Sequence, residues 1–286
     1  MNFFDTIFQA IVQGIAEFLP ISSSGHLSVI QYFTGTGADE GFLLTVALHF
    51  GTLISIIVAF WPTIKELAID FFRIILKIFT GNFSMIGKKG KEKMMLMLML
   101  SLVPALIVVI FKDFFEGLAS NGSIIEEGFC FLITAALLFL ASRTIEGKTD
   151  EKSIRPSQAI GVGFMQILSA FPGVSRSGSV MSAGIFCGFK KELAVTYSFL
   201  LGIPAIVAAV LSQLLDLASG NQPMPSGGDI FTILCGIVVS ATVGIFAIRF
   251  IKKLVLSNKF KYFAYYTFVL GVVVIILGLT GCFKAK

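Results

Sequence analysis

Charged residues are scarce in this chain. Asp, Glu, Lys and Arg make up 14% of its 286 residues, whereas 56% are hydrophobic and the mean hydropathy is +0.90. A soluble domain of this length needs a more polar surface, so the composition excludes that class and predicts a protein embedded in a bilayer. The net charge of +5 comes from short basic segments between apolar runs, a pattern that membrane topology explains, so we expect no nucleic-acid partner.

Paired cysteines and an N-terminal basic region are also missing. The four cysteines are widely separated in apolar segments, a spacing that fits neither a thiolate metal site nor a disulfide framework (Cys130, Cys187, Cys235 and Cys282). We expect them to be small interior residues. No Lys or Arg precedes the first apolar run, which therefore lacks the basic region of a cleavable secretory signal, and we expect this segment to be retained.

Six apolar stretches are long enough to be membrane spans. A helix needs about 20 residues to cross a hydrocarbon core of about 30 Å. The predicted spans are residues 42–61, 94–111, 128–142, 193–215, 230–248 and 262–283. Residues 64–79 mix charged and apolar side chains at helical spacing and predict an amphipathic helix on the membrane surface. The sequence thus predicts an all-α, polytopic membrane protein that forms one integral domain over residues 1–286.

Basic residues are concentrated in four connections. Residues 62–93 hold seven Lys or Arg, 143–155 four, 190–192 two and 249–261 five, whereas 112–127 hold one and 216–229 none. Cytoplasmic loops carry the excess of Lys and Arg, so these four connections are predicted to be cytoplasmic and both termini to lie outside.

Two segments resemble each other at a shift of 153 residues. Residues 13–25 read QGIAEFLPISSSG and residues 166–178 read QILSAFPGVSRSG. Each is an apolar stretch broken at Pro and Ser, with flanking pieces, such as 6–19 and 25–33, too short to cross a bilayer. We interpret them as re-entrant helix-loop-helix segments that enter from opposite sides and meet near the midplane, in an inverted repeat of about 1–150 and 151–286. Chance similarity of two Ser/Gly-rich stretches is the alternative.

Glu17 is the only charged side chain between Thr6 and Ala38. A carboxylate inside a membrane costs about 2.5–3.5 kcal/mol even on mild scales, so it is a functional candidate. Gln13 lies one turn earlier on the same face, and the two could present oxygen ligands to a divalent cation. A structural hydrogen-bonded pair is the alternative.

Small polar residues follow Glu17. Serine hydroxyls and the free N–H groups of a helix start form an anion cradle, although serine there is also ordinary capping. The candidates for substrate binding are Ser22, Ser24, Gly25, Ser175, Ser177 and Gly178. Ser23 and His26 are the candidate nucleophiles or acid–base groups.

Arg176 is the only charge between Pro156 and Phe189. Its guanidinium matches phosphate oxygens geometrically. A structural salt bridge with Glu17 is the alternative, and it would also require the two loops to meet.

The motifs QGIAEFLPISSSGH at 13–26 and PGVSRSG at 172–178 resemble the two signatures of the undecaprenyl-diphosphate phosphatase family of the bacitracin-resistance type, and the likeness extends over the whole chain. The resemblance implies dephosphorylation of undecaprenyl diphosphate, which regenerates the lipid carrier of cell-wall synthesis in the bacterial plasma membrane, with catalytic Glu17, Ser23, His26 and Arg176 in a site open to the extracytoplasmic side. It also implies a divalent cation, with Mg²⁺ favoured and Ca²⁺ as the alternative, held by Glu17 and by residue 13. The family has Glu or Gln at that first position, and Gln13 here weakens a two-carboxylate site.

Alternatives from other classes follow from the same features. Inverted repeats with broken helices are typical of transporters and lipid flippases. Ser24-Gly25-His26 also suggests the type 2 phosphatidic-acid phosphatase superfamily, but that chemistry needs a His after the Arg, and the only other His is His49, so we set it aside. The role of His49 and the oligomeric state, including a homodimer, stay open at this stage.

Overall fold

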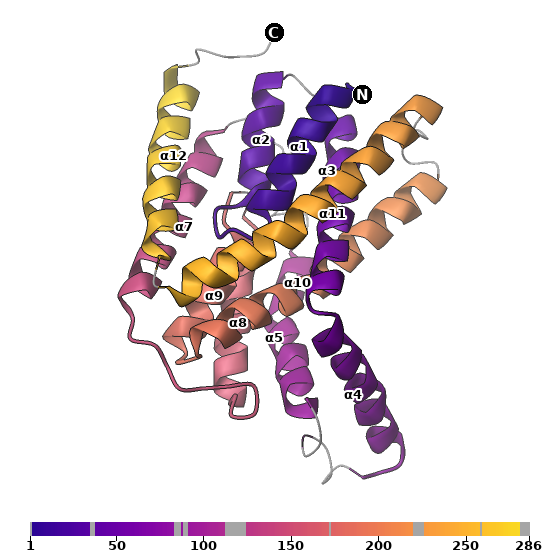
Figure 1. The fold of residues 1–286 in the computed structure, drawn as a ribbon, viewed down its shortest axis with the longest axis vertical. Coiled ribbons are helices and arrows are strands. Elements are labelled where there is room, and N and C mark those ends of the chain that lie inside the picture. The colour runs from indigo at the N-terminus through magenta and orange to yellow at the C-terminus, as the bar shows by residue number, and fades with distance from the viewer. Residues whose placement is uncertain are drawn as a thin grey trace.

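A computed structural model describes residues 2–34, 38–82, 87, 91–111, 124–171, 173–219, 226–257 and 259–280 (Figure 1). This part of the chain is helical and contains one isolated bridge, between Thr149 and Phe189, but no strand, which confirms the all-α prediction for it. Its helices are α1 (Phe3–Ala16), α2 (Ser23–Thr34), α3 (Ala38–Ala59), α4 (Trp61–Phe79), α5 (Glu92–Ile110), α7 (Ile125–Arg143), α8 (Pro156–Leu168), α9 (Arg176–Phe186), α10 (Lys191–Ala218), α11 (Gly227–Leu256) and α12 (Lys261–Thr280).

Helices occupy the regions of all six predicted spans. By length and composition α7, α10, α11 and α12 can each cross a membrane alone. The other two regions are α3 and α5, and residues 281–283 of the last predicted span lie outside the described residues. Helix α3 is followed, after a break at Phe60, by α4 at an angle of 90°. Pro62, in the first turn of α4, has no N–H to donate and its ring would clash with the carbonyl four residues earlier, so α3 cannot continue through it as one straight helix.

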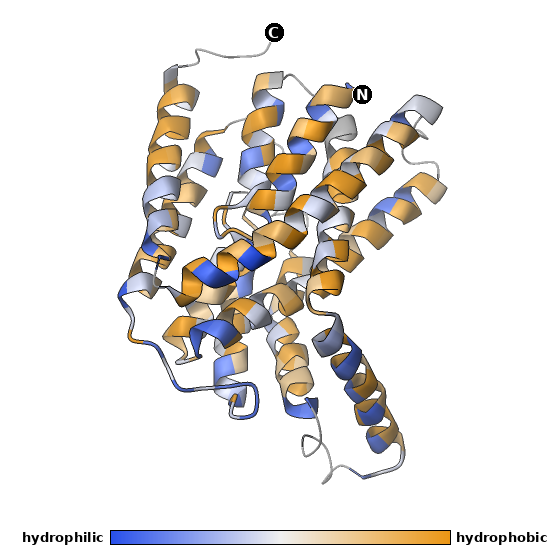
Figure 2. Cartoon of the chain, in the orientation of Figure 1, coloured by the Kyte–Doolittle hydropathy of each residue, from blue (hydrophilic) through white to orange (hydrophobic). Residues whose placement is uncertain are grey.

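Helix α4 is the predicted amphipathic helix. It buries Leu67, Asp70 and Ile74, while Figure 2 shows hydrophilic residues along its visible side. The Asp70 carboxylate accepts hydrogen bonds from the Arg73 guanidinium at 2.8 Å and from the Lys91 backbone N–H at 2.7 Å. The second bond ties α4 to the start of α5, and it explains why an acidic residue is buried on this helix.

Two helix-loop-helix units lie in different parts of the molecule. Figure 1 shows α1 and α2 in its upper part and α8 and α9 in its lower part. Helix α1 packs on α11, and α8 packs on α5. The first helices of the two halves begin 153 residues apart in three successive pairs: Phe3 and Pro156, Ser23 and Arg176, Ala38 and Lys191. The two predicted breaks therefore fall between α1 and α2 and between α8 and α9.

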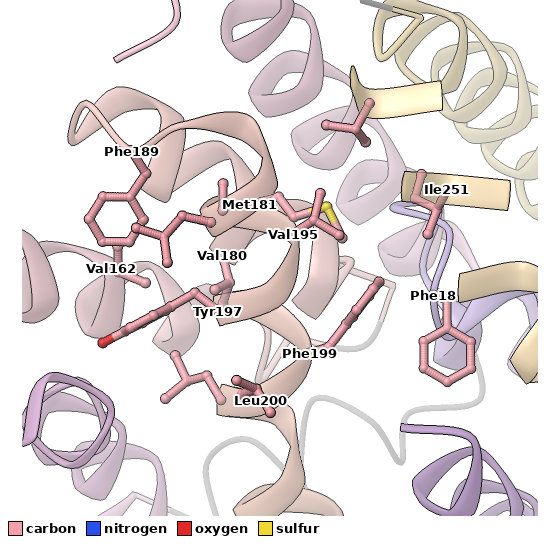
Figure 3. Close-up of a cluster of buried hydrophobic side chains, with 14 of the residues drawn as sticks. Phe18, Val162, Val180, Met181, Phe189, Val195, Tyr197, Phe199, Leu200 and Ile251 are labelled. Atoms are coloured by element: carbon pink, nitrogen blue, oxygen red, sulfur yellow. The ribbon is translucent and has the colours of Figure 1, made fainter. Parts of the chain in front are cut away.

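A buried hydrophobic cluster lies next to the first loop (Figure 3). Phe18, directly after Glu17, is fully buried and meets Phe199 of α10 edge-to-face, with ring centroids 5.3 Å apart. Complete burial of such a ring contributes about 1.5–3 kcal/mol. Tyr197, two residues earlier on α10, is also fully buried, and its hydroxyl pairs with that of Ser101 at 2.7 Å. The anchoring of Phe18 fixes where the backbone of Glu17 leaves α1.

Candidate active site

Glu17 caps the C-terminal end of α1 and is 6% exposed. Its Oε2 atom accepts hydrogen bonds from Gln13 Nε2 at 2.9 Å and from the Ser23 hydroxyl at 2.7 Å. Because Gln13 precedes Glu17 by four residues, the helix places both on one face, as the sequence predicts. Ser23 begins α2, so the loop of 17–22 folds back until its two ends touch.

Arg176 joins the second loop to the first. It is the first residue of α9, and its Nη2 forms an ion pair with Oε1 of Glu17. The Ser177 hydroxyl donates to the Leu19 carbonyl at 3.3 Å, and a Cβ on Gly25 would come within 3.0 Å of the Gly173 Cα. The prediction that the two loops meet is confirmed. Pro172, part of the second motif, lies outside the described residues.

Gly202 of α10 lies against the Arg176 guanidinium. Arg176 Nη1 donates to the Gly202 carbonyl at 3.1 Å, and a Cβ on Gly202 would lie 2.8 Å from Arg176 Cζ. A guanidinium has five N–H donors, and this contact uses one of them while Glu17 takes another. The glycine thus permits a close approach that fixes the plane of the guanidinium.

The two loops end in serines that make the same side-chain hydrogen bond from different backbones, with φ +72° at Ser22 and −68° at Ser175. Ser22 Oγ accepts from the Gly25 N–H at 3.2 Å, and Ser175 Oγ accepts from the Gly178 N–H at 3.0 Å. Ser24 approaches Ser22 through its hydroxyl at 3.4 Å, as Ser177 approaches Ser175 at 3.3 Å. Ser22 and Ser175 therefore act as caps, the ordinary reading of serine at a helix start.

The two histidines have different surroundings. His26 Nδ1 lies 2.6 Å from the Ser22 carbonyl, and its Nε2 lies 2.8 Å from the Tyr266 hydroxyl. Since a carbonyl only accepts, Nδ1 carries the proton, and Nε2 accepts from Tyr266. His49 of α3 lies with its Nε2 3.4 Å from Glu17 Oε2, and its Nδ1 lies 2.7 Å from the Thr45 carbonyl. His49, not His26, faces the carboxylate.

A cavity of 230 Å³ lies where the loops meet. Both halves of the chain line it with polar side chains: Glu17, Ser22, Ser23, Ser24 and His49 from the first, and Ser169, Ser175, Arg176 and Ser177 from the second. Of the residues predicted for the site, Gly25 and Gly178 lie behind their serine caps, and His26 is not part of the lining. Inside a low-dielectric interior these fixed charges and dipoles act strongly on an anion.

Gln13 and Glu17 are the two predicted ligands of a divalent cation, and the surroundings of Gln13 bear on that prediction. Gln13 is fully buried, and its Oε1 has no hydrogen-bond partner among the described residues, although Nε2 donates to Glu17. A buried amide oxygen beside a carboxylate suits a hard cation such as Mg²⁺, which prefers oxygen ligands and completes its shell with water and phosphate. The described residues contain no group of three His, Cys, Asp or Glu side chains suited to a metal. Gln13 is not part of the cavity lining and turns its Nε2 toward Glu17, so Glu17 is the predicted ligand placed to share a cation with a phosphate bound in the cavity.

Comparison with known proteins gives the family. The family described as bacitracin resistance protein BacA matches residues 6–273. The chain belongs to the BacA family. It is 36% identical over 282 residues to an undecaprenyl-diphosphatase of Alkaliphilus metalliredigens, covering 98% of this chain and 100% of that protein. Proteins of the same name from Halothermothrix orenii and Carboxydothermus hydrogenoformans are 35% and 33% identical, covering 97% and 99% of this chain and 98% and 100% of their own length.

Two residues of this BacA-family site were not assigned from the sequence. His49 looks the same as an interior histidine of a hydrophobic helix, and only the packing of α3 brings it to Glu17. Gly202 is one of 28 glycines, and its role depends on the position of Arg176, 26 residues earlier. Gly51 and Gly202 lie 151 residues apart, close to the 153-residue shift between the two loops, but this spacing does not indicate the contact with Arg176.

Proposed function

We propose that this protein is an undecaprenyl-diphosphate phosphatase, which hydrolyses the lipid diphosphate to undecaprenyl phosphate and inorganic phosphate. This reaction returns the lipid carrier to cell-wall synthesis and counteracts bacitracin. Membership of the BacA family and relatives named undecaprenyl-diphosphatase support it. The structural observation that carries it is the convergence of Glu17, Ser23 and Arg176, from two distant loops, on one polar cavity.

The charge pattern of the cavity suits a terminal phosphoryl group. Arg176 supplies a planar fork of donors. Helix α9 begins at the cavity, and the N–H groups of its first turn have no acceptor within the helix. Phosphate oxygens replace part of the pairing between Arg176 and Glu17 when substrate binds. Phosphoryl transfer depends mainly on positioning and on stabilising charge, so few polar groups suffice.

Ser23 is the nucleophile in this proposal. Its hydroxyl already donates to Glu17, which accepts the proton as Ser23 Oγ attacks the terminal phosphorus. The bond from that phosphorus to the bridging oxygen breaks, and undecaprenyl phosphate leaves with that oxygen. Water then hydrolyses the phosphoserine, which releases inorganic phosphate and restores the hydroxyl. His26 is a positioning residue, because its bond to the Ser22 carbonyl holds the turn that presents Ser23.

A divalent cation, Mg²⁺ or alternatively Ca²⁺, belongs to this proposal. Glu17 and the free Oε1 of Gln13 would hold it, and its charge would help to neutralise the diphosphate. Among the remaining polar residues, Ser22, Ser24, Ser175 and Ser177 complete the lining around the phosphates. Gly25 and Gly178 let the loops pack closely.

We further propose an inverted repeat with six spans and two re-entrant segments in the bacterial plasma membrane. The equal spacing of three helix starts, the matching side-chain hydrogen bonds of Ser22 and Ser175 and the opposite parts of Figure 1 taken by α1–α2 and α8–α9 support it. In Figure 1, α1 begins and α12 ends near the upper end, and the basic α7–α8 connection lies below. With cytoplasmic basic connections, both termini are extracytoplasmic, and the cavity opens to that side.

Release of inorganic phosphate by the purified protein in detergent tests the function. A transporter, which broken helices in a repeat also suggest, has no compartment to serve in a micelle. We expect release from undecaprenyl diphosphate, with strong loss in Arg176→Gln. A matched control is Lys191→Gln, which removes a surface pairing with Glu146 at 3.7 Å. The proposal is contradicted if the unmodified protein is well folded but releases no more phosphate than Arg176→Gln.

A further inference from the structure

An apolar groove continues from the polar cavity at Arg176. It has a volume of 440 Å³ and shares Ser169, Arg176 and Ala205 with the cavity. Helices α5, α8 and α10, which lie next to one another in Figure 1, form its walls. Away from the shared residues and Gln166 its lining is hydrophobic: Leu102, Ala105, Leu106, Val108, Ala170 and Pro204.

A second apolar groove follows the first. It has a volume of 300 Å³ and lies between α4, α5 and α10. Leu102 and Pro204 line both grooves, so the two adjoin. The polar cavity at Arg176 therefore continues into an apolar track, and the far end of this track is lined by residues of the amphipathic helix α4. We call the two parts the proximal groove, next to Arg176, and the distal groove, next to α4.

The proximal groove is open to the surroundings. Leu106, which lines it, is 57% exposed, and it lies on an apolar helix where the surrounding solvent is lipid. A hydrocarbon chain can therefore enter sideways from the bilayer. Polar groups are confined to the cavity end, where Gln166 is 7% exposed and its Oε1 has no hydrogen-bond partner. This distribution matches an amphiphile whose anionic head and apolar chain are joined.

We infer that the isoprenyl chain of the substrate lies in this track, with its first units in the proximal groove and later units in the distal groove. The inference rests on the proposed function, because the diphosphate in the cavity fixes where the attached chain begins. Continuity of the lining at Arg176 and Ala205 selects this route over the rest of the lipid-facing surface. Because the chain moves from lipid into protein, the grooves contribute affinity for long chains through van der Waals packing rather than through removal of apolar surface from water.

Filling each groove separately tests the inference. Ala105→Trp occupies the proximal groove and Ala68→Trp the distal one. Ala136→Trp is the control, because Ala136 is exposed on α7 and lines neither groove. Phosphate release is measured with dimethylallyl, farnesyl and undecaprenyl diphosphate, which share the head group and differ in chain length.

We expect Ala105→Trp to raise KM about 10-fold or more for farnesyl and undecaprenyl diphosphate, since the indole ring fills the space in which these chains pack. Ala68→Trp should raise KM for undecaprenyl diphosphate alone. A melting measurement on each variant serves as the folding control, and Ala136→Trp should leave KM unchanged for all three diphosphates. If KM depends on chain length in the same way in the unmodified protein and in all three variants, the inference is overturned and the phosphatase assignment stays intact.

Two further results distinguish a failure of the proposed function from a failure of the inference about the grooves. If the unmodified protein releases no phosphate from any of the three diphosphates, the proposed function itself fails. If Ala105→Trp changes the oligomeric state in size-exclusion chromatography and leaves KM unchanged, a second copy of the chain covers the groove, and the inference is overturned.

Discussion

Glu17 and Arg176 form a buried ion pair although 159 residues separate them in the chain. Each comes from a loop that interrupts a hydrophobic segment, and both side chains are largely removed from water, with 4% of Glu17 and 22% of Arg176 exposed. Pairing reduces the cost of burying both. The pair alone is compatible with a purely structural role, and catalysis and stability must be measured separately.

Removing both charges together separates these roles. Glu17→Gln or Arg176→Gln alone leaves an unpaired charge and should lower stability by up to about 3 kcal/mol, less than for a fully buried pair because the Arg176 side chain is 22% exposed. Each should also reduce turnover about 100-fold or more. The double variant should regain thermal stability but not activity. Recovery of both in phosphate-release and melting assays would identify the pair as structural only.

Gly202→Ala should impair catalysis without unfolding the protein. The added Cβ would lie 2.8 Å from the end of the flexible Arg176 side chain, which can move away at little cost in stability. Misplacing a catalytic group by about 1 Å can cost about 100-fold in rate. In Gly227→Ala, the control, the new Cβ meets nothing within 4 Å. Unchanged turnover in Gly202→Ala would show that the position of the guanidinium is not critical.

Replacing Ser23 by alanine should lower activity much more than replacing its neighbour Ser24. Ser23 donates to Glu17, whereas Ser24 contacts only the Ser22 hydroxyl among the described side chains, at 3.4 Å. We expect Ser23→Ala to lose activity about 1,000-fold or more and Ser24→Ala to lose about 10-fold or less, in the range that separates a nucleophile from a binding group. Acid quenching during turnover should trap phosphate on the peptide that contains Ser23. A full steady-state rate without any trapped phosphate would favour direct attack by water.

Gln13 should set the affinity for the cation. Gln13→Glu supplies a second carboxylate beside Glu17 and should lower the Mg²⁺ concentration needed for half-maximal activity, because added ligand charge tightens binding of hard cations. Gln13→Leu should raise it. Chelator should abolish activity in all three proteins, and Mg²⁺ or Ca²⁺ should restore it. The same half-maximal concentration in all three would exclude residue 13 from the cation site.

Hydropathy and charge were enough to locate most of the architecture. Spans and loops follow from local composition, and the meeting of Glu17 with Arg176 follows from the cost of isolated charges in lipid. Local composition does not report how helices pack. His26 and His49 each lie in apolar sequence, yet α3 brings His49 to Glu17, while His26 faces Tyr266 of α12. The sequence did predict that a span ends at residue 61 and that 64–79 form a separate helix, whereas the angle of 90° between α3 and α4 comes from the structure.

Orientation in the membrane can be tested with two single cysteines. Ser153 is exposed in the basic α7–α8 connection, and Ser226 is exposed just before α11. An impermeant maleimide added to intact cells should label Ser226→Cys but not Ser153→Cys, because Lys and Arg hold the α7–α8 connection in the cytoplasm. The unmodified chain gives the background from its own cysteines, and both variants should react after permeabilisation. Labelling of Ser153→Cys alone before permeabilisation would reverse the orientation, and the cavity would then open to the cytoplasm.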